Sequence, residues 1–205
     1  IIPAYNEEES IEKVINNLKQ NYSQYDYVII NDGSHDHTSE ICHKNKYKII
    51  DLPVNLGLTG AFQTGLKYAY KKGYDYAIQF DADGQHLPEY IPAMVDKIEE
   101  GYDMVIGSRF VEKPKPRSLR MLGSRVISTA IKITTGVHIA DPTSGMRLFN
   151  KTLIKEFAEN INYEPEPDTV SFLIKQGVKV AEVQVEMKER EAGESYLNLS
   201  RSIVY

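Results

Sequence analysis

Short runs of β-branched and aromatic residues alternate along the chain with segments in which apolar residues recur every three or four positions. The runs predict strands at residues 1–3, 27–30, 47–52, 76–80, 103–106 and 178–185. The helical spacing predicts helices at residues 11–18, 58–72, 88–100, 118–135 and 168–176, and one more that begins near residue 34 or 36. This alternation is typical of βαβ units, so we predict an α/β fold with a mostly parallel central sheet flanked by helices.

Residues at the ends of these segments support the predicted boundaries. Ser34 or Asp36 can cap the helix that precedes residue 47 by accepting a backbone hydrogen bond. Gly73 follows a helix at a position where a left-handed C-cap is common, and Pro88 suits a first helical turn. Residues 111–116 and 141–145 are predicted loops.

The length of 205 residues and a hydrophobic share of 41% fit one compact domain, which we expect to span residues 1–205. The chain opens within a predicted strand and stops within an apolar-patterned segment, so we expect it to be cut at both ends from a longer protein. Whether membrane helices follow residue 205 in the longer protein stays an open question. No apolar run within the chain approaches the roughly 20 residues that a membrane-spanning helix needs.

Charge and cysteine content narrow the class of protein. The net charge of −5 argues against a nucleic-acid-binding protein, which normally presents a basic face. The single cysteine, Cys42, cannot form an internal disulfide, and no secretory signal precedes the first strand. We therefore expect a reducing, cytoplasmic setting, in which an anionic ligand would be met by local basic groups.

Polar clusters follow three of the predicted strands, at residues 3–7, 31–34 and 81–86. Ligands of open α/β sheets bind at the carboxyl ends of strands, so these clusters are candidate binding residues. Asp32 can accept a hydrogen bond from a nucleobase N–H, and Glu7 can hold ribose hydroxyls. The alternative interpretation is that Asp32 only forms a turn and that Glu7 only places a charge at a helix N-terminus. Spacing alone leaves both interpretations open.

The pair Asp81 and Asp83 is a candidate metal site. Two carboxylates at i and i+2 can turn toward one point once the backbone leaves the strand, and Gly84 permits that bend. Such oxygen ligands suit magnesium or manganese, which share their remaining positions with water and substrate phosphates. Gln85 or His86 is a candidate for a further ligand. The alternative is a plain Asp/Gly-rich turn, but the position after a central strand favours the metal site.

Arginines supply the local positive charge. Arg109 follows the strand at residues 103–106, and Arg117, Arg120 and Arg125 crowd one later segment. Arginine binds phosphate bidentately, so we take Arg109 and Arg190 as the first candidates for a phosphate clamp.

No G-x-G-x-x-G motif follows the first strand, and GAFQTGLK at residues 60–67 departs from a P-loop and is predicted to be helical.

In these motifs the sequence resembles family 2 glycosyltransferases of the GT-A fold, and specifically their dolichyl- and polyprenyl-phosphate sugar transferase branch. The matching segments are IIPAYNEEES (1–10), NDGSHDHT (31–38), NLGLTGAFQTGL (55–66), DADGQHLPE (81–89), IGSRF (106–110), DPTSGMRLF (141–149) and REAGESYL (190–197). Their order and spacing over nearly the whole chain carry the resemblance. The Q-x-x-R-W signature of processive synthases is absent, and Tyr196 stands where a basic or small residue is expected.

The resemblance implies a role for each matching residue. The nucleotide sugar would be bound by Pro3, Ala4, Tyr5, Glu7, Asp32, Gly57, Asp81 and Ala82. A Mg²⁺ or Mn²⁺ ion would be held by Asp81, Asp83 and Gln85, and the acceptor phosphate by Arg109, Arg125, Arg190 and Ser195. The catalytic residues would be Asp83, Asp141 and Arg109.

The implied reaction is a single inverting displacement that moves a sugar from a nucleotide sugar to a polyprenyl phosphate. A phosphate monoester has a second pKa of about 6 and is largely ionised at neutral pH, so it needs no general base. A hydroxyl acceptor would need one, and Asp141 is then the candidate, with Glu166 or Asp168 behind it. A third hypothesis, from another class, is a non-catalytic regulatory domain that binds a nucleotide sugar.

The expected partners follow from this reaction. We expect a UDP-sugar first and GDP-mannose second, together with a polyprenyl-phosphate lipid at the inner face of the cell membrane. A membrane-embedded partner or domain and a homo-oligomer stay open, and no nucleic acid is expected.

Overall fold

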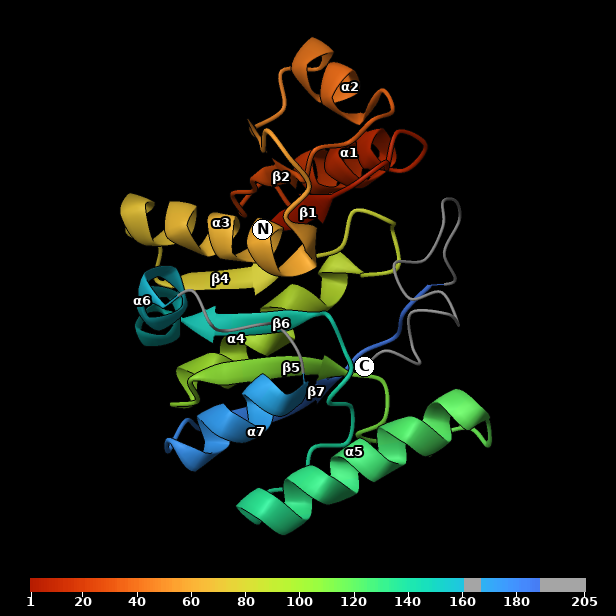
Figure 1. Cartoon of the computed structure of the whole chain (residues 1–205), viewed down its shortest axis with the longest axis vertical. Coiled ribbons are helices and arrows are strands. Elements are labelled where there is room, and N and C mark those ends of the chain that lie inside the picture. The colour runs from red at the N-terminus through yellow and green to blue at the C-terminus, as the bar shows by residue number, and fades with distance from the viewer. Residues whose placement is uncertain (161–166, 189–205) are drawn as a thin grey trace.

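The computed structural model describes residues 1–160 and 167–188 and places its strands in a three-stranded and a four-stranded part that hydrogen bonds of Ile1 join into one mixed sheet (Figure 1). The first half is parallel, in the order β1 (Ile2–Ala4), β2 (Ile29–Asn31), β3 (Ile49–Asp51). The second half has the order β4 (Tyr76–Gln79), β6 (Arg147–Asn150), β5 (Met104–Ser108), β7 (Val180–Gln184). The Ile1 nitrogen donates to Ile78 O at 2.8 Å and Phe80 N donates to Ile1 O at 2.9 Å, which joins β1 to β4.

The α/β prediction is confirmed, with one strand that the sequence did not predict. β6 runs antiparallel to both β4 and β5, while every other strand pair in the described residues is parallel. The hydrophobic pattern does not predict this strand, because the charged Arg147 interrupts its apolar run. The side chain is buried and donates to the carbonyl oxygens of Ser144 and Pro142, each at 2.9 Å.

Helices cover both faces of the sheet (Figure 1). One face packs on α1 (Ile11–Asn21), α2 (Thr38–Lys44) and α4 (Ile91–Glu99), which follows the single turn η1 (Pro88–Tyr90). The other packs on α3 (Gly57–Lys72), α5 (Leu119–Thr135), α6 (Lys151–Glu159) and α7 (Pro167–Lys175). Successive strand residues point to opposite faces, so Val105 joins the first core and Ile106 the second.

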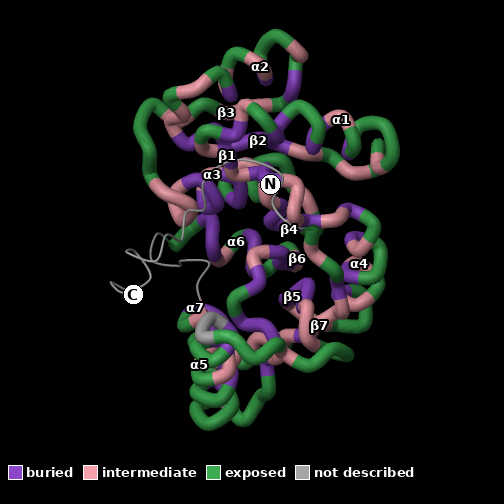
Figure 2. The backbone as a smooth tube through the Cα atoms, turned by 90° about the vertical axis from the view of Figure 1, so that its right-hand side faces the viewer, coloured by how far each residue is buried: buried purple, intermediate pink, exposed green. Residues whose placement is uncertain are grey.

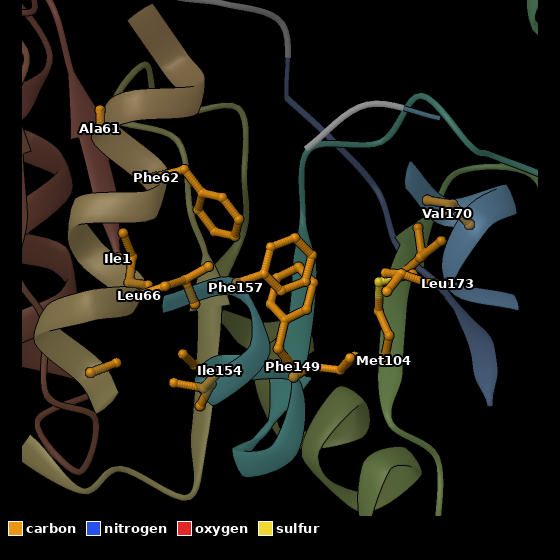
Figure 3. Packing of buried hydrophobic residues seen from close by; sticks show 14 of the residues in the cluster. Ile1, Ala61, Phe62, Leu66, Met104, Phe149, Ile154, Phe157, Val170 and Leu173 are labelled. Atoms are coloured by element: carbon orange, nitrogen blue, oxygen red, sulfur yellow. The ribbon is translucent and has the colours of Figure 1, made fainter. Parts of the chain in front are cut away.

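An aromatic cluster anchors α3 and α6 to the second face of the sheet (Figure 3). The ring of Phe149 on β6 lies 5.5 Å from Phe62 of α3 and 5.3 Å from Phe157 of α6, measured between centroids. The Phe149–Phe157 pair is edge-to-face, an arrangement that adds about 0.5–1.5 kcal/mol beyond the burial of its area. The cluster therefore fixes the reversed strand β6 in the middle of the sheet.

The helix boundaries largely agree with the sequence. Gly73 ends α3 with φ 76°, as predicted for a left-handed C-cap. The predicted helix α2 is present, but it begins at Thr38, two residues after Asp36, and His37 rather than Ser34 or Asp36 occupies the N-cap position. Asp36 nevertheless accepts from Thr38 N at 3.0 Å. Helix α6 was not predicted, although Asn150 caps it by accepting from Leu153 N at 3.0 Å. In the described residues no helix is long and apolar enough to span a bilayer.

Candidate active site

The predicted polar clusters gather at one edge of the sheet, where β1, β2, β4 and β5 end. Because β6 is antiparallel to its neighbours, it begins at the edge where they end. The loop that precedes β6, residues 141–146, therefore reaches the same edge between the ends of β4 and β5. Segments that lie far apart in the sequence meet there (Figure 1).

The loops after β1 and β2 hold one another. Asn6 N donates to Ser34 Oγ at 3.0 Å, and His35 N returns a bond to Asn6 Oδ1 at 2.9 Å. Glu7 N donates to Thr38 Oγ1 at 2.8 Å. The buried Glu7 carboxylate accepts from Ser10 Oγ at 2.7 Å, which gives it a role at the start of α1. Tyr5, predicted for the nucleotide pocket, lies edge-on to His35.

Asp32 is buried at the end of β2 with half of its carboxylate unsatisfied. Oδ1 accepts from Leu56 N at 2.7 Å, whereas Oδ2 has no hydrogen-bond partner among the residues that the structure describes. Burial raises the pKa of Asp32, against the backbone N–H groups of Leu56 and Gly57, which lower it. A buried acceptor without a partner is costly, so this oxygen is suited to accept an N–H from a ligand.

Gly33 allows the segment around Leu56 to reach Asp32. It adopts φ 68°, which disfavours other residues, and a Cβ there would lie 2.8 Å from Asn55 N. The close approach of these two backbone segments therefore requires glycine. It also brings Gly57, predicted for the nucleotide pocket, beside Asp32.

The loop after β4 orients its two aspartates differently. Asp81 N donates to His86 Nδ1 at 2.9 Å, so the imidazole proton resides on Nε2, which faces Asp81 Oδ2 at 3.5 Å. His86 is buried and thus holds Asp81 rather than facing solvent as a ready ligand. Asp83 Oδ1 accepts from Gln85 N at 2.9 Å. The Gln85 side chain donates to Lys188 O at 3.3 Å.

Gly145 joins the loop before β6 to this aspartate loop. A Cβ at Gly145 would lie 3.3 Å from Asp81 Oδ2 and 3.5 Å from His86 Cε1. A larger residue would push against the carboxylate that the sequence assigns to the metal. Sequence reasoning did not single out this glycine, because its neighbour Asp81 is reached only through the pairing of β6 with β4.

Arg109 and Asp141 form a bidentate ion pair at the end of β5. Arg109 Nε donates to Asp141 Oδ2 at 2.6 Å and the Arg109 Nη2 donates to Oδ1 at 2.9 Å. Glu182 of β7 accepts from the Asp141 backbone N–H at 2.8 Å and fixes the loop. Burial of Asp141 raises its pKa, but the Arg109 hydrogen bonds and charge outweigh this effect and hold it below its usual value.

The structure describes only some of the remaining residues that the sequence assigned to the acceptor or to a general base. Arg125 donates to Lys115 O at 2.7 Å and so braces the loop before α5. Lys115, which the sequence did not single out, donates to Ser124 Oγ at 2.8 Å and to Ser128 Oγ at 2.9 Å. Arg190, Ser195 and Glu166 lie outside the described residues. Asp168 lies in the first turn of α7.

Known proteins share this sequence pattern and fold. A family model described as glycosyl transferase family 2 matches residues 1–157. A UDP-N-acetylglucosamine–dolichyl-phosphate N-acetylglucosaminyltransferase of Methanococcus voltae is 34% identical over 90% of this chain and 83% of its own. The undecaprenyl-phosphate mannosyltransferase of Micrococcus luteus is 29% identical over 97% of this chain and 86% of its own.

Solved structures agree on the fold. Glucosyl-3-phosphoglycerate synthase from Mycobacterium tuberculosis, in complex with Mn²⁺, UDP and phosphoglyceric acid, aligns with a TM-score of 0.64. The alignment covers 94% of this chain and 70% of that one at 19% identity. The same enzyme has also been solved with Mg²⁺ and UDP.

Proposed function

The chain belongs to glycosyl transferase family 2 and is a glycosyltransferase, and we propose that it transfers a sugar from a nucleotide sugar to a polyprenyl phosphate with inversion. The observation that carries the proposal is the meeting of Asp81 with the loop of Asp141 and Gly145 at one sheet edge. Donor and acceptor residues would thus face one reacting centre. The family assignment counts against a non-catalytic regulatory domain.

The donor would lie across the ends of β1, β2 and β4. The free Asp32 oxygen suits a nucleobase N–H, and the loop of residues 3–7 lies beside it through the bonds between Asn6 and residues 34–35. A UDP-sugar is the first expectation, supported by the uridine nucleotides in the neighbouring structures, and GDP-mannose is the second. Pro3, Ala4, Tyr5, Glu7, Gly57 and Ala82 stay predictions for this pocket.

The residues present fit a divalent metal that substrate phosphates complete. Across residues 1–160 and 167–188, no group of three or more His, Cys, Asp or Glu side chains could hold a metal ion. Mg²⁺ is usually bound by one or two carboxylates plus substrate phosphates, so Asp81 and Asp83, with Gln85, provide a suitable set. Bound Mg²⁺ or Mn²⁺ would neutralise the charge that develops on the leaving diphosphate.

The state of Asp141 favours a phosphate acceptor over a hydroxyl acceptor. A general base needs a carboxylate free to take a proton, with a pKa near the working pH. Both Asp141 oxygens accept from Arg109, and its pKa is held low. We assign Asp141 to holding the Arg109 guanidinium at the end of β5, where it can meet the acceptor phosphate. A phosphate oxygen that is already ionised then attacks without a base.

The test is release of nucleoside diphosphate from a panel of UDP- and GDP-sugars, with Mn²⁺ or Mg²⁺, a short polyprenyl phosphate and a hydroxyl-terminated analogue. We expect release that requires the polyprenyl phosphate and stops with EDTA, together with a sugar-lipid product. Asp141→Asn should still transfer sugar to the polyprenyl phosphate, because an ionised phosphate oxygen needs no base to remove a proton. Transfer to the hydroxyl analogue alone, lost in Asp141→Asn, would replace this proposal with the base-catalysed reaction.

Asp32→Asn should weaken binding of the released nucleoside diphosphate. The amide of asparagine has one acceptor oxygen in place of two. In either orientation its NH₂ group therefore faces an N–H donor, which is that of Leu56 or that of the nucleobase. A hydrogen bond to a charged group is worth about 1.5–3 kcal/mol, which corresponds to roughly 10- to 100-fold in affinity. Titration calorimetry measures this, with Asp96→Asn on the exposed side of α4 as the control. Equal affinities for both variants would exclude Asp32 from the pocket.

A further inference from the structure

Helix α5 carries an apolar stripe on its solvent side. Leu122, Val126 and Ile133 are 54%, 63% and 79% exposed. Their spacing of four and seven residues puts them on one face, opposite the buried Met121, Ser124, Ser128 and Ile131. Single exposed apolar residues are ordinary, but three large ones on one helix face, with only Thr129 between Val126 and Ile133 on that face, mark a contact surface. Figure 2 shows α5 largely exposed at the end of the molecule.

The same part of the chain is strongly basic. Residues 113–140 contain Lys113, Lys115, Arg117, Arg120, Arg125 and Lys132 and no Asp or Glu, although the whole chain has a net charge of −5. Lys132 lies in the last turn of α5 and is exposed. An apolar stripe with basic flanks is typical of helices that lie on anionic membrane surfaces.

We propose that this face of α5 lies on an anionic lipid membrane, with the stripe at the headgroup boundary and the exposed Lys132 beside it over the phosphates. Position supports this occupant, because the loop that leads into α5 starts directly after Arg109 and is held to the helix by Lys115 and Arg125. Docking would therefore bring the lipid surface to the acceptor side of the site. The inference rests on the proposed function for its lipid acceptor and adds the surface that reaches it.

Vesicle sedimentation tests the surface without donor or acceptor. We expect the chain to bind phosphatidylcholine vesicles that contain phosphatidylglycerol, more weakly at high salt, and to bind pure phosphatidylcholine poorly. The double variant Val126→Asp, Ile133→Asp should lose vesicle binding. Lys132→Glu should weaken it by about fivefold or more, since one basic residue contributes about that factor near an anionic surface. Lys71→Glu, in the last turn of α3, is the matched control and should bind normally.

A fluorescent reporter gives an independent measurement. The chain has no tryptophan, so Val126→Trp introduces a single indole whose emission should shift to the blue when anionic vesicles are added. Tyr76→Trp, at the exposed start of β4, should not shift. Absence of vesicle binding, no shift at residue 126, or a dimer that the double aspartate variant dissociates would each overturn the inference.

The two proposals fail separately. Transfer to a soluble short polyprenyl phosphate without vesicle binding would overturn only the membrane surface. Vesicle binding through α5 without transfer to any acceptor would overturn only the proposed reaction. The double variant should keep transfer to the short acceptor in solution, because Val126 and Ile133 are exposed and are not among the residues assigned to the site.

Discussion

Asp83→Asn should lower kcat/KM for sugar transfer by about 100- to 1,000-fold, the range found when one electrostatic group that stabilises developing charge is removed. The amide keeps the shape of the side chain and can still accept from Gln85 N, so the loop should stay folded. The negative charge that would help hold the metal is lost. Steady-state kinetics at several Mn²⁺ concentrations should show the loss together with a higher metal requirement.

Asp75→Asn is the matched control for that variant. Asp75 lies just before β4 and is exposed, whereas Asp83 follows the strand and is buried. The control should keep full activity. The free energy of unfolding of both variants should lie within about 1 kcal/mol of that of the parent chain, as is usual for surface or isosteric changes. Full activity in Asp83→Asn would remove this residue from the reaction and with it the proposed metal site.

Arg109→Ala should destabilise the fold by about 3 kcal/mol at neutral pH and also abolish transfer. The estimate is the low end of the range for breaking a buried pair, because Arg109 keeps 24% exposure while Asp141 has none. Chemical denaturation measures the stability. Lys151→Ala removes a cation from a solvent-exposed pair with Asp75 and should cost at most about 1 kcal/mol.

The pH dependence separates a lost ion pair from a general loss of packing. In the parent chain the pKa of Asp141 is lowered, so its pairing stabilises the fold above the unfolded pKa and fades only as pH falls through the lower folded value. Without the Arg109 side chain, burial, which raises the pKa of Asp141, is the largest effect left, opposed only by the backbone N–H of residue 109 and the Thr143 hydroxyl. The stability difference between parent and Arg109→Ala should then shrink as pH falls from 7 toward 4. A difference that is constant with pH would contradict this account.

The sequence predicted the residues whose positions depend on local order. Asp32 and Arg109 directly follow β2 and β5, and only one residue separates Asp81 from β4, so the strand pattern alone placed them at one edge of the sheet. The parallel pairing of β1, β2 and β3 likewise follows from successive βα units. The Asp81-x-Asp83 motif was recognisable for the same reason.

Residues positioned by the reversed strand could not be predicted in this way. The charge of Arg147 masks β6, and the pairing of β6 with β4 and β5 joins segments separated by tens of residues. Without that pairing, Asp141 was a candidate base and Arg109 a free phosphate clamp, and their mutual ion pair was not foreseen. The hydrogen bond from Asp81 N to His86 was also missed, because it depends on which imidazole nitrogen carries the proton.

The reversed strand places one short loop, residues 141–146, between the proposed donor site and the proposed acceptor site. Gly145 packs against Asp81 on the donor side, and Asp141 holds Arg109 on the acceptor side. A shift of that loop to fit one substrate would move groups that contact the other. Thermodynamic linkage makes such an effect reciprocal: any factor by which the nucleotide sugar changes the affinity of the chain for the lipid phosphate is also the factor by which the lipid phosphate changes its affinity for the nucleotide sugar.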